Sequence, residues 1–278
     1  MYITLILFYM KKSIIINARN EGSWTTKTIS NFDKHFTDVD EIIGVDDGSY
    51  NKWVTKYHPK FKLITTSGAI GVARSRLLGV QSAIGDVVLI SDGHVYYNSG
   101  DIDKAWELAS KGYIVTSTTI SMLSGKEHGC GRSHDTKTHS ATNARAQEGD
   151  EAGLIGGVYF MRKDVAEEII CPSKSHGYNE QLMTYAALSL GHKIYCLPSF
   201  KFEHYYKKKF NYHVKHAEQT RNRNLIDWWF FDRRPPSNVD HLELDYKKFI
   251  DEYRVLSPSQ LRTKMQQIND NLLRKKQS

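Results

Sequence analysis

The sequence predicts an α/β protein with a mostly parallel sheet flanked by helices, followed by a helical C-terminal extension. Three observations support this fold class. Short runs of β-branched and apolar residues recur in the first half of the chain, segments with helical spacing separate them, and several runs end in a turn that carries a carboxylate. Such alternation is typical of βαβ units. The 278 residues, 40% of them hydrophobic, can bury a sizeable core.

The first half of the chain supplies most of the expected sheet. We predict strands at 13–17, 41–45, 61–65 and 87–91. We expect the first helix to be capped by Ser23, the second to run from Gly71 to Ser82, and the third to begin near Asp101 and end at Gly112.

The second half begins with a polar stretch at 124–150, where we expect a flexible loop without metal. A zinc site is the weaker alternative, because one cysteine and irregular spacing suit zinc poorly; its ligands would be His128, Cys130, His134 and His139. Beyond it we predict a strand at 153–161, helices at 164–170 and 179–190, a strand at 193–197 and helices at 246–253 and 258–276.

These elements divide the chain into three parts. Residues 1–12 form an apolar leader or an extra edge strand, 13–232 the main domain and 233–278 the helical extension. The apolar stripe of the last helix is too short for a coiled coil and favours docking on the main domain. The first apolar run is too short to span a bilayer and lacks the features of a signal peptide, so we expect no transmembrane segment.

Composition gives weaker indications of setting and partners. The three cysteines are scattered and form no disulfide framework, so the cytoplasm is the simplest location. The net charge of +7 favours an anionic partner such as nucleic acid, nucleotide phosphates or an acidic surface. The sequence does not indicate an oligomeric state.

The strand at 87–91 leads into Asp92, Gly93 and His94. In an extended segment, side chains two positions apart point the same way, so Asp92 and His94 can reach one cation. A carboxylate with a neutral imidazole suits Mn²⁺ well, Zn²⁺ less well and Mg²⁺ least. The alternative is a capping aspartate beside a histidine that faces solvent.

Carboxylates also follow the first two predicted strands, as Glu21 and as the pair Asp46 and Asp47. Because the carboxyl ends of parallel strands meet at one edge of a sheet, we expect these groups to join Asp92 in one acidic cleft.

Several short motifs occur in an order that resembles a known family. They are Asn20-Glu21, Asp46-Asp47-Gly48-Ser49, Gly71-Val72-Ala73-Arg74-Ser75-Arg76-Leu77, Asp92-Gly93-His94, Gly156-Gly157, Gly177-Tyr178-Asn179-Glu180, Glu203-His204-Tyr205-Tyr206-Lys207 and Asp227-Trp228-Trp229. From about Ile14 to Phe231 the chain resembles a GT-A glycosyltransferase of the class that contains glycosyltransferase family 2. Within that class it is most similar to the catalytic domain of polypeptide N-acetylgalactosaminyltransferases.

The resemblance implies a UDP-sugar donor, carrying an N-acetylhexosamine or a hexose, and a role for each motif. It implies that Asp92, His94 and His204 hold Mn²⁺, with Mg²⁺ as the alternative, and that Arg74 and Lys207 contact the diphosphate. The remaining donor contacts that it implies fall on Ala18, Asn20, Glu21, Asp46, Asp47 and Gly71 for the nucleotide, and on Gly156, Gly157 and Glu180 for the sugar. It further implies transfer with retention of configuration and without a protein nucleophile.

Structural explanations of these residues stay open at this level. His204 could be a buried core histidine, Arg74 and Arg76 a solvated helix face, and Glu180 an acid favoured by the helix dipole. Gly156 and Gly157 could form a bulge.

The acceptor is the least determined part of the hypothesis. Family members that act on mucin-like peptides carry a membrane anchor, disulfides and a lectin domain, none of which this sequence suggests. Basic residues alternate with aromatic ones between Lys207 and Arg223, as suits a polyanion or an exposed base. We therefore weigh an intracellular polyanion, such as a hydroxylated base in DNA, above a secreted protein. The basic segment could equally be a solvated lid.

Other functions remain as alternatives. The chain could act on protein Ser/Thr, a glycan or a lipid, or be an inactive module that binds a nucleotide-sugar or nucleic acid. A nucleotidyltransferase is disfavoured, because residues 17–22 lack the glycine-rich phosphate loop that it would need.

Overall fold

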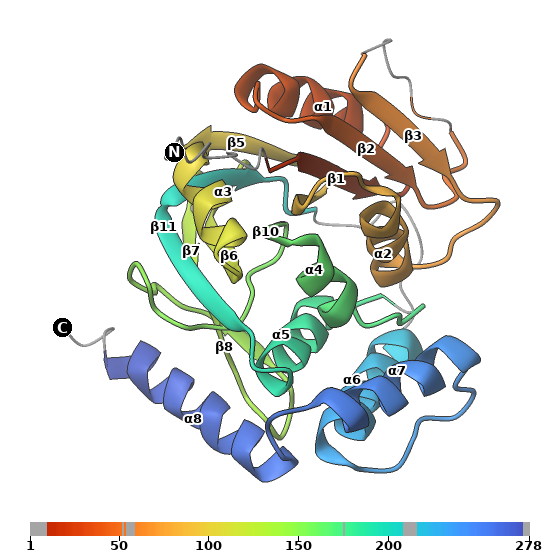
Figure 1. The fold of residues 1–278 in the computed structure, drawn as a ribbon, viewed down its shortest axis with the longest axis vertical. Coiled ribbons are helices and arrows are strands. Elements are labelled where there is room, and N and C mark those ends of the chain that lie inside the picture. Colours follow the sequence, from red (N-terminus) through yellow and green to blue (C-terminus); the bar gives the residue numbers. More distant parts are fainter. Residues whose placement is uncertain (1–9, 52, 54–58, 175, 208–215, 275–278) are drawn as a thin grey trace, which may run out of the picture.

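A mixed sheet crosses the whole molecule in the computed structural model, which describes residues 10–274 except 52, 54–58, 175 and 208–215 (Figure 1). Its strands run in the order β3-β2-β1-β4-β10-β6-β11-β5, and β7 pairs with β6. The strands of this sheet are β1 (Lys12–Ala18), β2 (Glu41–Asp46), β3 (Phe61–Thr65), β4 (Val87–Asp92), β5 (Val95–Ser99), β6 (Tyr113–Ser121), β7 (Glu127–Cys130), β10 (Val158–Arg162) and β11 (Lys193–His204).

Eight helices are described: α1 (Ser23–His35), α2 (Val72–Ser82), α3 (Ile102–Ser110), α4 (Lys163–Ile169), α5 (Asn179–Ser189), α6 (His216–Phe231), α7 (His241–Tyr253) and α8 (Pro258–Arg274). Apolar side chains of α1 and α3 share one core cluster with one face of the sheet, and those of α2, α4 and α5 share a second cluster with the other face. Covered on both sides, the central strands contain continuous apolar runs, as in β1, whose Ile14, Ile15 and Ile16 are fully buried.

The parallel part of the sheet sets the edge at which function is expected. β1 lies between β2 and β4 and runs parallel to both, with Ala18 opposite Asp46 and Asn17 opposite Asp92. The carboxyl ends of these strands therefore meet, as predicted from the carboxylate-bearing turns. β10, β5 and β7 run antiparallel to their neighbours.

Two predicted helix starts differ from the structure. α1 follows Gly22, which has a φ of +58° and makes no side-chain cap, so Ser23 is the first helical residue and not the cap. α7 begins at His241 and not at 246, because Asp240 and Glu243 form a capping box there. α3 follows the prediction, with Asp101 accepting a hydrogen bond from the backbone N–H of Lys104.

The polar stretch expected to be a flexible loop contains three short strands. β7 joins the main sheet, and β8 (Arg132–His134) and β9 (Ala141–Asn143) form a second, two-stranded sheet. The proposed zinc ligands are not gathered: the described residues contain one metal-competent group, and it lies elsewhere. The strand expected from residue 153 begins only at Val158, after a turn that contains the glycine pair.

The strand expected at 193–197 extends to His204 as β11, with a register shift against β6 between Leu197 and Lys201. After it, α6, α7 and α8 group beside α5 (Figure 1). The stripe on α8 is buried in the same core cluster as α5 and β10, through Leu261, Met265, Ile268 and Leu272. This confirms docking rather than a coiled coil. Within the described residues, no helix combines the length and apolar character needed to cross a bilayer.

Candidate metal and nucleotide-sugar site

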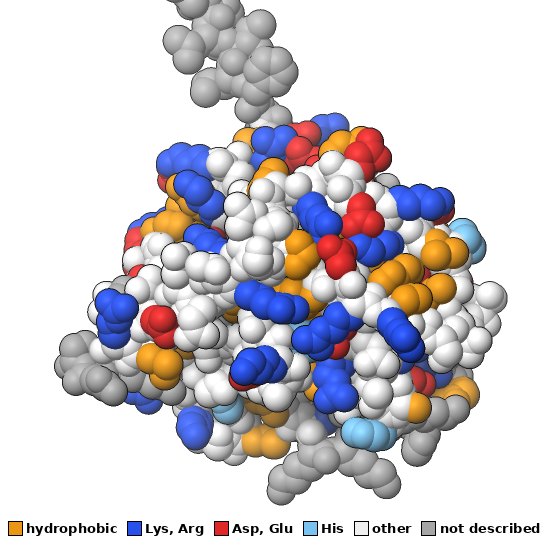
Figure 2. Space-filling view, turned by 90° about the horizontal axis from the view of Figure 1, so that it is seen from below, with side chains coloured by type: hydrophobic (Ala, Val, Ile, Leu, Met, Phe, Trp, Pro, Cys, Tyr) orange, Lys and Arg blue, Asp and Glu red, His pale blue; other side chains and the backbone are white. Residues whose placement is uncertain are grey.

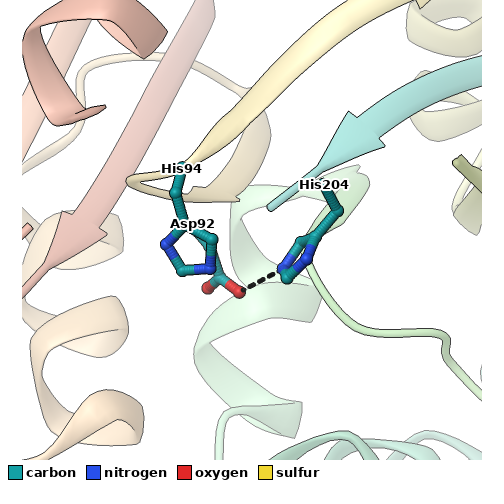
Figure 3. Close-up of side chains that lie close together, drawn as sticks. All are labelled: Asp92, His94 and His204. Atoms are coloured by element: carbon teal, nitrogen blue, oxygen red, sulfur yellow. Dashed lines mark ion pairs between the residues drawn. The ribbon is translucent and has the colours of Figure 1, made fainter. Parts of the chain in front are cut away.

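The end of β4 and the end of β11 bring three ligand-type side chains together. β4 ends at Asp92, a tight turn carries His94, and β5 starts at Val95, which pairs with His204 at the end of β11. One ligand atom of each of Asp92, His94 and His204 lies within 4.8 Å of the other two. Figure 3 shows both imidazoles directed at the Asp92 carboxylate, with His204 Nε2 at 3.5 Å from Asp92 Oδ2.

Two glycines make this arrangement sterically possible. A Cβ at position 93 would lie 2.5 Å from the Cβ of Ala18, so the turn between Asp92 and His94 can sit against β1 only as glycine. A Cβ at Gly157, whose φ is +116°, would lie 2.8 Å from Cδ2 of His204. The second glycine of the Gly156-Gly157 pair therefore lies directly against the imidazole of His204, one of the predicted metal ligands.

A buried arginine holds the carboxylate of Asp92. Arg76 on α2 is 2% exposed, and its Nη2 lies 2.9 Å from Asp92 Oδ1 and 3.6 Å from Glu180 Oε1. Burial alone would raise the pKa of Asp92, but the charge of Arg76 and a hydrogen bond with His204 hold that pKa well below its usual range. Asp92 is therefore an anion at any physiological pH.

Arg74, predicted to contact the diphosphate, points elsewhere. Its Nη2 lies 2.5 Å from Asp240 Oδ2 at the start of α7, and its Nε donates to the carbonyl of Pro172 at 2.8 Å. The structure thus places Arg76, and not Arg74, beside the predicted metal ligands. Two positions on a helix are about 200° apart, so only one of the two arginines can face the sheet edge.

Glu21, at the end of the turn after β1, lies between two cationic or ionisable groups. Its Oε1 forms an ion pair with Lys207 Nζ, and its Oε2 lies 3.4 Å from His94 Nδ1. Burial would raise the pKa of Glu21, but His94 and Lys207 together lower it below its ordinary value. Burial lowers the pKa of His204, which keeps its imidazole neutral and able to bind a metal.

These residues line a cleft of about 220 Å³. Among the predicted residues it contains Ala18, Glu21, Asp47, Asp92, His94, Gly156, Glu180, His204 and Lys207. A second hollow of about 190 Å³ shares Arg19, Asp47, Val72 and His176 with it and adds Gly71. The shared residues place the two hollows next to each other. A larger hollow near Asp86 and Arg162 lies at the opposite edge of the sheet, away from this chemistry.

Some predicted residues shape the cleft without lining it. Asn20 joins the first two strand-end turns: its N–H donates to Ser49 Oγ and its Oδ1 accepts from the N–H of Tyr50, both at 2.8 Å. Asp46 is buried and accepts from the N–H of Ser49 at 3.0 Å. The neighbouring Asp47 reaches the cleft, and its carboxylate accepts from the N–H groups of Ile70 and Gly71.

Among the cleft residues that sequence reasoning missed are Arg76, Arg132, His176 and Tyr206. Arg76 could have been considered, because residues two positions apart on a helix point to nearly opposite faces and only one of Arg74 and Arg76 can face the strand ends. Arg132 could not, because it lies in the segment expected to be a flexible loop. Its Nε donates to Asn143 Oδ1 at 3.0 Å, and its backbone pairs with Gly153 through two hydrogen bonds of 2.8 Å.

Comparison with known proteins defines the class of this chain. Residues 13–170, more than half of the chain, match the Glycosyl transferase family 2 model. The chain therefore belongs to glycosyl transferase family 2, which confirms the predicted family and the predicted glycosyltransferase class. No curated protein sequence matches it.

Solved structures of glycosyltransferases share the fold. A structure of GalNAc-T7 with UDP, GalNAc and Mn²⁺ is 15% identical with a TM-score of 0.65, and the match covers 94% of this chain and 55% of that one. A structure of Staphylococcus aureus TarS residues 1–349 with UDP-GlcNAc is 16% identical with a TM-score of 0.58, covering 95% and 72%. The chain thus spans about half the length of GalNAc-T7. These similarities confirm the GT-A fold.

Proposed function

We propose that this protein transfers a hexose or an N-acetylhexosamine from a UDP-sugar to an acceptor hydroxyl, with a divalent metal ion held by Asp92, His94 and His204. The observation that carries the proposal is this three-residue cluster at the carboxyl edge of the sheet in a family 2 chain. The structures of GalNAc-T7 with UDP and Mn²⁺ and of TarS with UDP-GlcNAc share this fold and support the choice of donor.

The donor set suits the metal. Asp92 supplies an anionic oxygen, and the two imidazoles supply nitrogen ligands, a mixture that Mn²⁺ accepts more readily than Mg²⁺. When bound, the metal neutralises charge on the departing diphosphate. The chain adds its own positive charge through Arg19 and Lys207 at the cleft wall.

We propose retention of the anomeric configuration. An inverting enzyme needs a carboxylate to accept the acceptor proton, and each carboxylate that lines the described cleft already has partners. Glu180, which reaches the sugar side, accepts from Tyr159 OH at 3.1 Å and lies 3.6 Å from Arg76 Nη2. Both contacts fall on Oε1 of Glu180.

For the acceptor we propose an intracellular polyanion, such as a hydroxylated base in DNA. Arg132 supports this: it lines the cleft with Gly156 and Tyr206, and the side-chain partner described for it is the amide oxygen of Asn143 rather than a carboxylate. Figure 2 shows many more Lys and Arg than Asp and Glu side chains on the face seen from below, which includes the C-terminal helices. The three cysteines are free and buried, as suits a reducing compartment. Lys208, Lys209 and Lys215 lie outside the described residues.

Release of UDP tests the proposal. UDP-glucose, UDP-galactose and their N-acetylhexosamine counterparts should be supplied with and without Mn²⁺, against an oligonucleotide with a hydroxymethylated base, a Ser/Thr peptide and a glycan. We expect Mn²⁺-dependent release that the oligonucleotide accelerates, with the donor anomer retained in the product. Tight UDP-sugar binding without turnover on any acceptor would instead identify a binding module. An inverted product would make Glu180 the base.

A further inference from the structure

Glu21 is a buried carboxylate that lines the cleft but is not among the three proposed metal ligands. Its side chain is 5% exposed and that of Lys207 is 6% exposed, so the ion pair between them is shielded from solvent. The other oxygen of Glu21 faces the imidazole of His94. The Glu21 carboxylate thus contacts two residues of the proposed catalytic site, Lys207 through Oε1 and His94 through Oε2.

Glu21 and His94 lie close together without forming a hydrogen bond of good geometry. His94 Nδ1 and Glu21 Oε2 are both buried, and neither makes a hydrogen bond with good geometry to any described residue. They lie 3.4 Å apart, so a small rotation would satisfy both. Figure 3 shows one ring nitrogen of His94 near the Asp92 carboxylate and the other turned away from it. A proton on Nδ1 leaves the lone pair of Nε2 for a metal.

We infer, on the basis of the proposed function, that Glu21 is a positioning residue that links metal binding to diphosphate binding. It fixes the metal-binding tautomer of His94, and it holds Lys207 beside the cleft until a diphosphate attracts that ammonium group. Once Lys207 turns to the diphosphate, the full charge of Glu21 acts on His94. Donor binding therefore raises the affinity of the site for the metal ion, because the Glu21 charge acts on the metal ligand His94.

Lys207 and Glu21 therefore have opposite effects on the metal site before donor arrives. Lys207 competes with His94 for the carboxylate, and its positive charge repels a cation nearby. Removing Lys207 should tighten metal binding, whereas removing the charge of Glu21 should weaken it. A purely structural ion pair predicts the same loss from both changes, because each leaves a buried charge without its partner.

The test measures Mn²⁺ affinity by the loss of the free-ion electron paramagnetic resonance signal, with and without UDP, on the full chain. We expect Glu21→Gln to weaken Mn²⁺ binding by about 10–100-fold. We expect Lys207→Met to tighten Mn²⁺ binding in the absence of UDP and to weaken UDP binding. UDP should tighten Mn²⁺ binding less in Glu21→Gln than in the unmodified protein. Glu203→Gln is the matched control, since that carboxylate accepts from Asn98 Nδ2 outside the cleft.

The double variant Glu21→Gln/Lys207→Met carries no unpaired buried charge, so it keeps the test valid if Glu21→Gln does not fold. It should bind Mn²⁺ more weakly than Lys207→Met, because the two variants differ only in the charge of Glu21. If the unmodified protein binds Mn²⁺ and Glu21→Gln matches it within about twofold, this inference is wrong while the proposed function stands. Parallel losses in both single variants would also overturn it. If the unmodified protein binds no Mn²⁺, the proposed metal site fails, and this inference fails with it.

Discussion

The cleft has two walls of different origin. One wall consists of the ends of β1, β4 and β11 with the buried face of α2, and it supplies Asp92, His94, His204 and Arg76. The other comes from residues 122–157, a connection between β6 and β10 that contains the short strands β7, β8 and β9, and it supplies Arg132 and Gly156. The first wall is built on long apolar strands, and the second on a polar segment.

The two walls are held by different interactions. The strand ends are fixed by the parallel ladders of β1 with β2 and β4, and by the apolar packing under them. The polar segment is fixed by contacts between residues far apart in sequence, such as the two hydrogen bonds between His134 backbone and the Asn269 side chain on α8. We infer that the first wall carries the chemistry and the second mainly positions substrate, so variants in the two walls should differ in kind.

The largest effect is expected from the strand-end wall. His204→Gln keeps a polar side chain of similar size but removes an imidazole ligand, so sugar transfer should fall by at least about 1000-fold. Activity is measured as UDP release at saturating Mn²⁺, and the fold by circular dichroism. His128→Gln is the control. Both histidines contact the Tyr206 ring, His204 at 4.3 Å and His128 at 4.7 Å between ring centroids, but His128 does not line the cleft. Activity within tenfold of normal in His204→Gln would remove that residue from the metal site.

A smaller loss should separate the two arginines of α2. Arg76→Gln leaves Asp92 without its buried cation, so we expect a loss of activity of about 100-fold and of stability of about 3 kcal/mol. Arg74→Gln removes the ion pair with Asp240, in which the two side chains are 19% and 24% exposed. We expect this loss to lower the free energy of unfolding by about 1 kcal/mol, the upper value for a surface ion pair, and to leave activity within about threefold of normal. Kinetics and urea unfolding on the two variants provide the measurement. Equal losses of activity would restore Arg74 to the site.

Only part of the strand-end wall could be predicted from the sequence. Val87 to Ile90 is an apolar run that can only be a buried strand, so the position of Asp92 and His94 at its end followed directly. That His204 joins them followed only from a family resemblance, because no local pattern records that β11 extends to His204 and pairs with β5. On α2 the resemblance singled out Arg74, whereas the structure places Arg76 beside Asp92; both residues are polar, and only the tertiary fold distinguishes them.

The polar segment was mispredicted for a related reason. Its strands are three or four residues long, and their register is fixed by Gly131, Gly153 and the distant α8 rather than by alternating apolar residues. A short polar sequence with several glycines and histidines looks the same whether or not such partners exist. The burial of His134 and His139, both 0% exposed, is therefore a property of the whole fold.

The burial of His134 predicts that the second wall contributes to the pH dependence of stability. His134 has no hydrogen-bond partner for either ring nitrogen among the described residues, and burial lowers its pKa from 6.5 to about 3. Between these values the unfolded chain binds a proton that the folded chain does not. The free energy of unfolding should therefore fall as pH falls below about 6.5, by up to about 1.4 kcal/mol per pH unit from this residue.

His134→Leu should flatten this slope while leaving stability at pH 7.5 the same or higher, because an unsatisfied polar ring is replaced by an apolar side chain. Urea unfolding between pH 7.5 and 5 measures the difference from the unmodified protein. His35→Gln, at the end of α1, serves as the histidine control. An unchanged slope in His134→Leu would show that the ring reaches solvent or a partner.

The smallest effect tests whether α8 holds the second wall in place. Asn269 Oδ1 accepts from the N–H of His134 at 3.1 Å, and its Nδ2 donates to the His134 carbonyl at 2.9 Å. Asn269→Ala removes both bonds from one short strand and should lower the free energy of unfolding by about 1–2 kcal/mol. Gln266→Ala, which loses only an exposed contact with Asp270 on the same helix, should change it by less than about 0.5 kcal/mol. Because Arg132 begins the strand that Asn269 anchors, Asn269→Ala should also raise the KM for acceptor more than it lowers kcat. An unchanged KM with the expected loss of stability would mean that the hairpin keeps Arg132 in place without α8, and the two walls would then be less different than their sequences suggest.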